Sequence, residues 1–350
     1  MIDILGMLVT MGDLILGKKK DKEQDPISEE KGAEFYLKEH PVKKFNYRPQ
    51  TLSEYISQDN AKLLIKLLVK EILEVGKYRH ILISGTRGHG KTTLGEIICK
   101  SIGFEMNYFI SNAFTKENLR EFLVKNEVSK IPQVLMLDEV HGLDKAGKNA
   151  VGFEYFYPIL EDMKLPNTEI NLNPFIIISC TTELDYLQRY YPPFVDRFVN
   201  VQLEHYKEED IKAILTNYNN QVYQKNINVE DFKLLSQNSR FNPRTAILMF
   251  DLFIASGKMD EILKCFRIVK SGLTTQDIII LDHLFQIKKP VGCETLAIIG
   301  NTDKETYMTL IEPYLLQEHY LGRTSRGRLL LPRGEELLRS LDENQNMPEM

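Results

Sequence analysis

One stretch, residues 81–94, constrains the fold of this chain more than any other. It reads ILISGTRGHGKTTL, which is a short apolar run, a glycine-rich loop and the start of a helix-like pattern. Within it, Gly85, Gly90, Lys91 and Thr92 match the phosphate-binding pattern G-x-x-x-x-G-K-[ST]. An ordinary glycine turn between a strand and a helix is the alternative. Because strand and helix patterns flank the loop on both sides, we favour a nucleotide-binding loop.

The residues of this loop suit a polyphosphate. Its glycines, which include Gly88, let successive backbone N–H groups face phosphate oxygens, and the positive end of the following helix adds to the anion site. His89 and Thr93 lie in the same stretch and are predicted to contribute to cofactor binding. Lys91 is expected to reach the outer phosphates, and the Thr92 hydroxyl is expected to hold Mg²⁺. The predicted cofactors are therefore ATP and Mg²⁺.

A second motif follows downstream. Residues 134–137 are apolar and lead into Asp138 and Glu139. A carboxylate at the end of a strand can hold Mg²⁺ through water, and the next carboxylate can polarise an attacking water. A solvated strand end is the alternative, but the preceding phosphate loop favours a catalytic pair. A third apolar stretch, 175–180, ends at Thr181, so the carboxyl ends of three parallel strands are expected to converge.

The remaining pattern divides the chain into regions. Strand-like and helix-like stretches alternate up to about residue 200, which predicts a parallel α/β sheet covered by helices on both faces. One amphipathic helix is expected from the apolar positions Leu63, Leu64, Leu67, Leu68, Ile72 and Leu73. Beyond residue 200 the pattern turns helical, and from about Thr274 short helices mix with a strand pair. The polar residues from Asp342 onward are predicted to be disordered.

Composition limits the partners and the compartment. The net charge of -5 and the pI near 5.9 argue against a uniformly basic surface, so contact with nucleic acid requires a local patch. The four cysteines show no C-x-x-C spacing, which argues against structural zinc and against a disulfide framework. No apolar run is long enough to span a bilayer. A cytoplasmic protein is therefore expected.

The first residues carry a separate signal. Residues 1–17 are fairly apolar, but their lysines come after the apolar stretch, which is the wrong order for a signal peptide. The positions that fall roughly on one helical face are Ile2, Leu5, Leu8, Val9, Ile15 and Leu16. A packed N-terminal helix, a docking helix for a partner protein and a membrane-surface helix are the three interpretations. Residues 18–39 are charge-rich and predict a linker.

Several further motifs occur in a fixed order. They are RPQTLSEYISQ at 48–58, the phosphate loop, DEVH at 138–141, YPILED at 157–162, TT at 181–182, DRF at 196–198, NPR at 242–244 and EPYLLQ at 312–317. This order resembles the AAA+ ATPases and, within them, the RuvB family of Holliday-junction branch-migration motors, over roughly residues 44–338. The resemblance implies an AAA+ P-loop NTPase domain with a helical lid and a C-terminal winged-helix domain. The expected domains are an N-terminal helix and linker (1–43), a large ATPase domain (44–200), a helical lid (201–268), a winged helix (269–340) and a disordered tail (341–350).

The resemblance also implies roles for individual residues. Thr181 is similar to the sensor-1 residue that detects the γ-phosphate, and Arg244 is similar to sensor 2 on the lid. The residues expected to cradle adenine are Arg48, Pro49, Tyr55 and Ile56. Each of these roles is carried over from the family through the motif that contains the residue.

Arg197 is similar to the arginine finger that reaches the nucleotide of a neighbouring subunit. A guanidinium supplied by a neighbour stabilises charge on the transferred phosphoryl group, so hydrolysis would require a homo-oligomer. The family resemblance implies a hexameric ring. An ordinary surface cation is the alternative for Arg197, and its neighbours Asp196 and Phe198 favour the finger.

The winged-helix region carries a basic patch. Four arginines and no acid lie within residues 320–333 of an otherwise acidic chain. Such a patch suits phosphate contacts that position DNA without reading its sequence. The predicted DNA contacts are Arg323, Arg326 and Arg328, and a solvated charged hairpin is the alternative.

The sequence also departs from the RuvB pattern. Only eleven residues stand between Asp162 and Pro174, where RuvB carries a longer β-hairpin that docks its partner RuvA. Ser57 and Val195 replace a glycine and an arginine of the family. ATP chemistry is expected to survive these changes, whereas they leave open a partner protein other than RuvA. His141 is open to two interpretations, a catalytic or coupling residue and a packed polar residue.

Three functions remain for a chain of this kind. The leading hypothesis is a RuvB-like ring-forming ATPase that couples ATP hydrolysis to movement along, or remodelling of, duplex or branched DNA. The second is an AAA+ loader or recruitment switch that acts on a protein partner at DNA without translocation. The third is a scaffold that binds nucleotide without turnover. The intact set of Lys91, Asp138, Glu139 and Arg197 argues against the scaffold.

Overall fold

The computed structural model describes residues 47–145, 147 and 150–345. These residues belong to the unit Tyr47–Met350, which is described by itself. The predicted N-terminal helix and linker lie outside the described residues. Within the described part, no helix is both long and apolar enough to cross a membrane.

A five-stranded parallel sheet forms the centre of the first part of this unit. Its strands are β1 (Ile81–Ser84), β2 (Glu105–Ile110), β3 (Gln133–Asp138), β4 (Ile176–Thr181) and β5 (Val199–Gln202). Their order in the sheet is β2-β3-β4-β1-β5, and every neighbouring pair is parallel. The three central strands are buried almost throughout, which is why they read as continuous apolar runs. Because all strands are parallel, their carboxyl ends share one edge.

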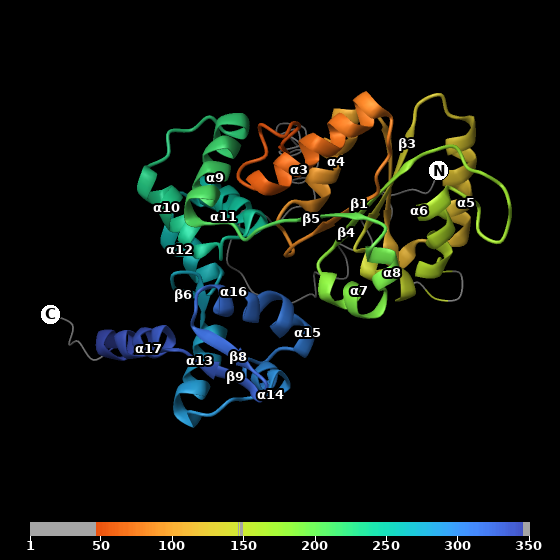
Figure 1. Ribbon diagram of the computed structural model, residues 1–350. Helices are drawn as coiled ribbons and strands as arrows, with labels where there is room; N and C mark the ends of the chain where they lie inside the picture. The colour runs from red at the N-terminus through yellow and green to blue at the C-terminus, as the bar shows by residue number, and fades with distance from the viewer. Residues whose placement is uncertain (1–46, 146, 148–149, 346–350) are drawn as a thin grey trace, which may run out of the picture. The chain divides into compact units, whose positions relative to one another are not determined.

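Helices cover both faces of the sheet (Figure 1). One face carries α3 (Asp59–Lys70) and α4 (Lys91–Ile102), and the other carries α5 (Lys116–Val128), α6 (Tyr157–Asp162), α7 (Leu184–Tyr190) and α8 (Pro192–Val195). Alternate residues of β3 divide between the two layers. Val134 and Met136 pack with α3 and α4, whereas Leu135 and Leu137 pack with the other helices. This arrangement confirms the predicted α/β class.

The predicted amphipathic helix is present as α3, but its buried face differs from the expected one. Ala61, Ile65 and Leu68 face the core. Leu63 and Leu67, two of the predicted apolar positions, are instead exposed, with 60% and 58% of their surface accessible. Apolar residues occur on two sides of this helix, so periodicity alone does not select the side that packs on the sheet.

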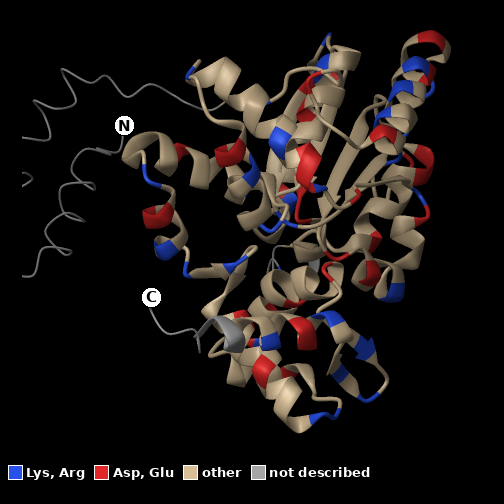
Figure 2. Cartoon of the chain, turned by 90° about the vertical axis from the view of Figure 1, so that its left-hand side faces the viewer, with Lys and Arg blue, Asp and Glu red and all other residues tan. Residues whose placement is uncertain are grey.

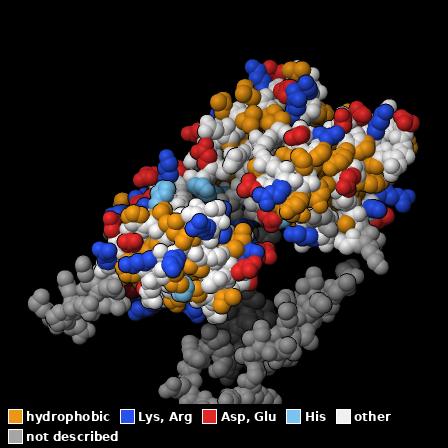
Figure 3. All heavy atoms as spheres, turned by 60° about the horizontal axis from the view of Figure 1, so that its bottom comes forward, with side chains coloured by type: hydrophobic (Ala, Val, Ile, Leu, Met, Phe, Trp, Pro, Cys, Tyr) orange, Lys and Arg blue, Asp and Glu red, His pale blue; other side chains and the backbone are white. Residues whose placement is uncertain are grey.

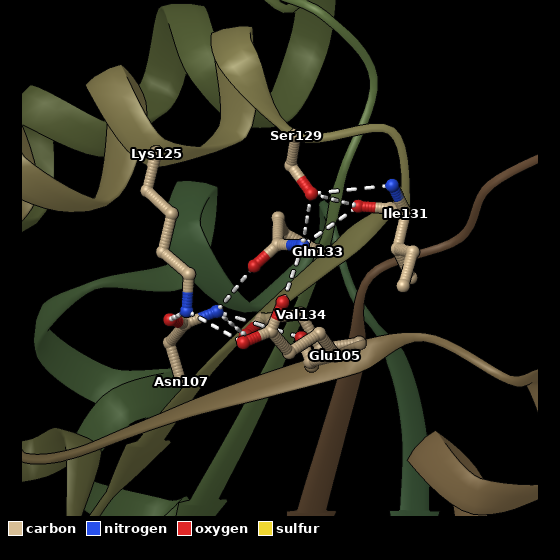
Figure 4. A network of polar contacts seen from close by, with 7 residues as sticks. All are labelled: Glu105, Asn107, Lys125, Ser129, Ile131, Gln133 and Val134. Carbon is tan, nitrogen blue, oxygen red and sulfur yellow. Dashed lines mark hydrogen bonds and ion pairs between the residues drawn. The ribbon is translucent and has the colours of Figure 1, made fainter.

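A polar network fixes α5 against the edge strand β2 (Figure 4). The buried side-chain amide of Gln133, at the start of β3, donates to the Glu105 carboxylate (3.2 Å) and to the Ser129 hydroxyl (3.0 Å). Lys125 on α5 donates to Glu105 (2.8 Å) and to the Asn107 side-chain oxygen (2.7 Å). Charged side chains along an edge strand also disfavour pairing with another chain.

The next four helices pack around their own core. They are α9 (Glu208–Val222), α10 (Val229–Asn238), α11 (Pro243–Ser256) and α12 (Met259–Cys265), and Phe250 is fully buried among them. Asn242 caps α11, because its side chain accepts the backbone N–H groups of Arg244 and Thr245. Pro243 takes the first helical position, as the sequence predicts.

The last part has the order of elements of a winged helix. It comprises β6 (Ile268–Lys270), β7 (Leu273–Thr274), α13 (Thr275–Ile287), α14 (Cys293–Ile299), α15 (Lys304–Thr306), a π-helical turn η5 (Tyr307–Ile311), α16 (Glu312–Gln317), β8 (Leu321–Thr324), β9 (Gly327–Leu330) and α17 (Pro332–Gln345). Val291 pairs with Arg328 through two backbone hydrogen bonds of 2.8 Å, which adds an isolated antiparallel β-bridge beside the two-stranded hairpin.

The expected limits of the regions agree only roughly with these elements. The sheet strand β5 continues to Gln202, past the predicted boundary at residue 200, and the boundary at 268/269 falls inside β6. The helix α17 continues to Gln345, so the predicted disordered tail (341–350) is helical over its first residues. Residues 346–350 lie outside the described part. The domain boundaries themselves stay a prediction.

Candidate nucleotide-binding site

The glycine-rich loop lies between β1 and α4, at the carboxyl edge of the sheet. Gly88 and Gly90 have φ angles of +83° and +86°, in the left-handed region that favours glycine. A Cβ atom on Gly88 would lie 2.5 Å from the Asn242 side-chain oxygen, and one on Gly90 would lie 2.8 Å from the Tyr55 hydroxyl. The loop therefore needs glycine at both positions, for its conformation and for its close packing.

Lys91 is the first residue of α4 and is buried. Its ammonium group donates to the carbonyl oxygens of Gly85 (2.9 Å) and Thr86 (3.2 Å), so it lies against the loop. Burial lowers the pKa of Lys91, and the nearby carboxylates of Glu139 and Asp138 oppose that shift. A buried cation beside a glycine-rich loop at a helix N-terminus fits a polyphosphate anion.

Asp138, at the end of β3, accepts three hydrogen bonds. The Thr92 hydroxyl (3.0 Å) and the Tyr108 phenol (2.8 Å) donate to its Oδ2, and the Glu139 N–H (3.0 Å) donates to its Oδ1. The two predicted Mg²⁺ ligands, Thr92 and Asp138, are thus in contact. Tyr108 is not among the predicted site residues. Burial and the hydrogen bond to Asp138 raise the pKa of Tyr108 to about 12, so its phenol stays protonated and donates.

A second group of contacts surrounds Glu139. The Thr182 hydroxyl donates to the Glu139 carboxylate (3.2 Å), and His141 Nδ1 lies 3.5 Å from the same oxygen. His141 Nδ1 is also 3.1 Å from the Thr181 hydroxyl, and its Nε2 is 3.2 Å from a Glu183 oxygen. The structure therefore brings Glu139 and Thr181 together through His141. His141 is a packed polar residue here, and its part in coupling stays a prediction.

The residues predicted to cradle adenine separate into two groups. Tyr55 is 3% exposed, and its hydroxyl donates to the carbonyl oxygen of His89 (2.9 Å), so it supports the phosphate loop. Arg48 is exposed and pairs instead with Glu96 on α4 (2.7 Å). The half-buried members of the set are Pro49 and Ile56. Their contact with a base stays a prediction.

His89 is buried within the loop. Its ring packs edge-on against Tyr206 at 5.2 Å, and Tyr206 also donates to the His89 carbonyl (3.3 Å). Burial lowers the pKa of His89 to about 3, so the imidazole is neutral at physiological pH. Thr93 follows in the first turn of α4 and is half-buried. Both residues lie in the stretch predicted to hold the cofactor.

The N-terminus of α11 faces the loop. The Asn242 side-chain amide donates to the carbonyl oxygen of Arg87 (2.8 Å) while its oxygen caps the helix. The positive charge of Arg244 adds to the effect of burial in lowering the pKa of Lys91, because the two cations repel each other. Asn242 belongs to a motif that the sequence singles out, but its bond to the loop is not predictable from that motif.

Arg197 lies at the opposite edge of the sheet from the phosphate loop. Val199, at the start of β5, pairs with Ile81 at the start of β1, and both strands then run toward the loop. Arg197 precedes β5 and is therefore at the amino edge, while the loop follows the carboxyl end of β1. Within one chain, the structure does not bring Arg197 to the predicted nucleotide site.

Arg197 is held by three local contacts. Its guanidinium donates to the Glu161 carboxylate (2.5 Å) and to the Pro193 carbonyl (2.5 Å), and it lies 5.0 Å from the centre of the Tyr157 ring. Its Nε is buried without a hydrogen-bond partner among the described residues. A cavity of about 510 Å³ opens beside it and includes Lys77 among its lining residues.

Two of the three predicted DNA-contacting arginines are engaged inside the winged helix. Glu312, which is fully buried, pairs with Arg323 (2.8 Å) and with Arg328 (2.5 Å), and each guanidinium donates twice. Arg326 lies at the turn of the hairpin and is exposed. Figure 2 colours the positions of Lys and Arg blue along the ribbon, and the arginines of this hairpin are among them. In the face shown in Figure 3, basic, acidic and apolar side chains are interspersed, without one continuous basic surface.

Fold and site together define a P-loop NTPase of the AAA+ class that carries a C-terminal winged helix. A family model for the P-loop domain of the Holliday junction DNA helicase RuvB matches residues 47–203, and one for the RuvB C-terminal winged helix domain matches residues 270–339. The chain belongs to the RuvB family.

Individual relatives agree with this assignment. The Holliday junction branch migration complex subunit RuvB of Phytoplasma mali is 30% identical over 328 residues, which cover 86% of this chain and 95% of that protein. The subunit of the same name from Acholeplasma laidlawii is 32% identical over 308 residues, which cover 81% and 88%. Among solved structures, the RuvB Holliday junction branch migration motor of Thermotoga maritima is similar, with a TM-score of 0.69 and 26% identity over 83% of this chain and 98% of that chain.

Proposed function

We propose that this chain is a ring-forming ATPase that couples ATP hydrolysis to movement along duplex or branched DNA, as in branch migration during recombination or repair. The observation that carries the proposal is that the residues predicted to hydrolyse ATP lie at two opposite edges of one sheet. The loop with Lys91 and Asp138 lies at the carboxyl edge, and Arg197 lies at the amino edge. Two relatives with similar sequences are named subunits of the Holliday junction branch migration complex.

The separation of Arg197 from the phosphate loop implies that several copies of this chain assemble. An arginine at the amino edge can serve a nucleotide only in the site of a neighbouring copy, since the sheet separates it from its own loop. A head-to-tail contact of this kind uses two different surfaces and generates a closed ring when the rotation closes. We propose a hexameric ring, in keeping with the family resemblance. The cavity beside Arg197 fits a surface that receives the neighbouring subunit.

Each residue of the nucleotide site has a proposed task. Lys91 and the loop N–H groups hold the phosphates, and Thr92 with Asp138 holds Mg²⁺, which supplies charge neutralisation. Glu139 orients the attacking water and accepts its proton, while Thr181 and Arg244 sense the γ-phosphate. Arg197 of one copy stabilises charge on the phosphoryl group in the site of the next.

DNA contact is assigned to the hairpin of the winged helix. Arg326 at its turn is free to meet a phosphate, whereas Arg323 and Arg328 first balance the charge of Glu312. Two guanidinium groups on one carboxylate leave a net positive charge, so the pair still favours an anion. We propose contacts to the phosphate backbone without sequence reading.

The protein partner is proposed to differ from RuvA. The segment between Asp162 and Pro174 forms a compact turn, closed by hydrogen bonds from Leu165 N–H to Ile170 (2.9 Å) and from Leu172 N–H to Met163 (2.7 Å). Such a turn offers little surface for docking. A cytoplasmic location agrees with an ATP-dependent function on DNA and stays a proposal. A loader or recruitment switch is not favoured, because the relatives are named as branch migration subunits.

The proposal is tested by measuring ATP hydrolysis with and without duplex and four-way DNA. A motor is expected to be stimulated by DNA and to displace the third strand of a bound triplex. Arg197→Ala is expected to abolish hydrolysis while ATP still binds. Stimulation without displacement of the third strand would instead indicate a loader.

A further inference from the structure

Two side chains of the short helix α6 hold Arg197 on its own chain. Tyr157 and Glu161 are four residues apart and therefore share one face of this helix. The guanidinium carbon lies 5.0 Å from the centre of the Tyr157 ring, and the Glu161 carboxylate accepts a hydrogen bond of 2.5 Å from Nη2. From α8, the carbonyl of Pro193 accepts a hydrogen bond of 2.5 Å from Nη1. All three contacts are made within one copy of the chain.

The ion pair with Glu161 is open to solvent. Side-chain exposure is 25% for Arg197 and 61% for Glu161. Water and salt screen an ion pair that is exposed to this degree, so it contributes little free energy. Glu161 therefore sets the position of the guanidinium but can be displaced by a second anion.

The contacts on this chain leave one donor of Arg197 unsatisfied. Its Nε is buried and has no hydrogen-bond partner among the described residues, although a guanidinium presents five N–H donors. A buried donor without an acceptor destabilises the conformation that contains it. A position in which Nε also meets an acceptor is therefore favoured once such an acceptor is supplied.

The cavity beside Arg197 has room for an anionic acceptor. Its volume is about 510 Å³, and both Arg197 and Glu161 line it. Lys77 and Arg79 also line it, and Arg79 is itself paired with Glu71 (3.1 Å). Because cationic side chains outnumber acidic ones among the described lining residues, the cavity suits an anion. An anion that enters competes with Glu161 for the same guanidinium.

We propose that Glu161 is a positioning residue for Arg197, which holds the guanidinium on its own chain until the triphosphate of a neighbouring copy displaces the carboxylate. The ion pair must break before Arg197 reaches that nucleotide, so Glu161 opposes the assembly of two copies. The phosphate oxygens then replace the carboxylate as acceptors. The inference rests on the proposed function, because it assumes that Arg197 serves a neighbouring copy.

The test follows assembly of the full-length chain by sedimentation velocity, with Mg²⁺ and the slowly hydrolysed analogue ATPγS, over a range of protein concentrations. Glu161→Gln keeps the length of the side chain but loses its charge, so the pairing with Arg197 weakens. The protein concentration at which half of the chains are assembled is expected to fall about two- to fivefold, the range that exposed ion pairs give. A purely structural role of Glu161 would instead leave this concentration unchanged or raise it.

Glu261→Gln is the matched control. Glu261 is an acid of similar exposure (52%) that pairs with Lys258 (2.7 Å) on α12 and does not contact Arg197. Its loss should leave the half-assembly concentration equal to that of the natural chain.

The same substitution is then made in the Arg197→Ala protein. Without the guanidinium there is no ion pair to break, so Glu161→Gln should no longer lower the half-assembly concentration. An unchanged or higher concentration for Glu161→Gln alone, or an equal fall in both backgrounds, would overturn the role of Glu161. A natural chain that stays monomeric with Mg²⁺ and ATPγS at every concentration would overturn the proposed ring, and this inference with it.

Discussion

His80 gives the most quantitative prediction of this structure. It is 6% exposed, directly before β1, and its Nδ1 accepts the N–H of Ile177 at the start of β4 (3.0 Å). Its carbonyl accepts the N–H of Val199 in β5 (2.8 Å), and its ring packs 5.9 Å from that of Phe198. His80 thus links the beginnings of β1, β4 and β5, and it lines the same cavity as Arg197.

Burial lowers the pKa of His80 from 6.5 to about 4. A proton therefore binds the unfolded chain more tightly than the folded one, so the stabilisation is present above pH 6.5 and is lost as the pH falls toward 4. The difference between the two pKa values corresponds to roughly 3 kcal/mol when the whole range is crossed. Between pH 7 and pH 5, about 2 kcal/mol of unfolding free energy should be lost through this group.

The assay is urea unfolding at pH 7 and at pH 5, for the natural chain and for His80→Asn. Asparagine keeps an acceptor near the position of Nδ1 but does not titrate. The variant is expected to lose about 2 kcal/mol less between the two pH values. Because His89 is present in both proteins, its own titration cancels in the comparison. An identical pH dependence in the two proteins would refute the reasoning.

Two further predictions concern the nucleotide site. Gly88→Ala forces a Cβ atom into the Asn242 side chain and into a left-handed conformation that costs roughly 1–2 kcal/mol, so ATP affinity should fall at least about tenfold in a fluorescence titration. Unchanged affinity would show that the loop does not need this close packing. Tyr108→Phe removes one of three hydrogen bonds to Asp138, a half-exposed one worth roughly 1 kcal/mol, so the Mg²⁺ concentration for half-maximal hydrolysis should rise about fivefold. A Mg²⁺ requirement equal to that of the natural chain would contradict the role given to Tyr108.

Local patterns in the sequence were sufficient to predict the parallel sheet and the phosphate loop. The buried strands appear as apolar runs because both faces are covered, and the loop glycines are required by the positive φ angles of Gly88 and Gly90. The contact between Thr92 and Asp138 also follows from the topology, because parallel strands bring their carboxyl ends to one edge.

The missed contacts depend on partners that are distant in sequence. Tyr108 reaches Asp138 only because Ile110 pairs with Asp138 across β2 and β3, and no local pattern encodes that register. The basic patch around Arg328 looks unopposed along the sequence, yet the helix before the hairpin delivers Glu312 into it. The net charge of one segment does not show whether an acidic side chain from another segment, such as Glu312, neutralises it in the folded chain.

The central claim is that each nucleotide site is shared between two copies of this chain, and mixing two inactive variants tests it most directly. Glu139→Gln keeps the Arg197 finger but lacks the group that activates water, whereas Arg197→Ala has the opposite defect. Neither variant should hydrolyse ATP alone. In an equimolar mixture that assembles at random, about a quarter of the interfaces combine an intact site with an intact finger, so about a quarter of the natural activity should return. A mixture that stays inactive although mixed rings form, or an Arg197→Ala protein that is fully active alone, would contradict the account.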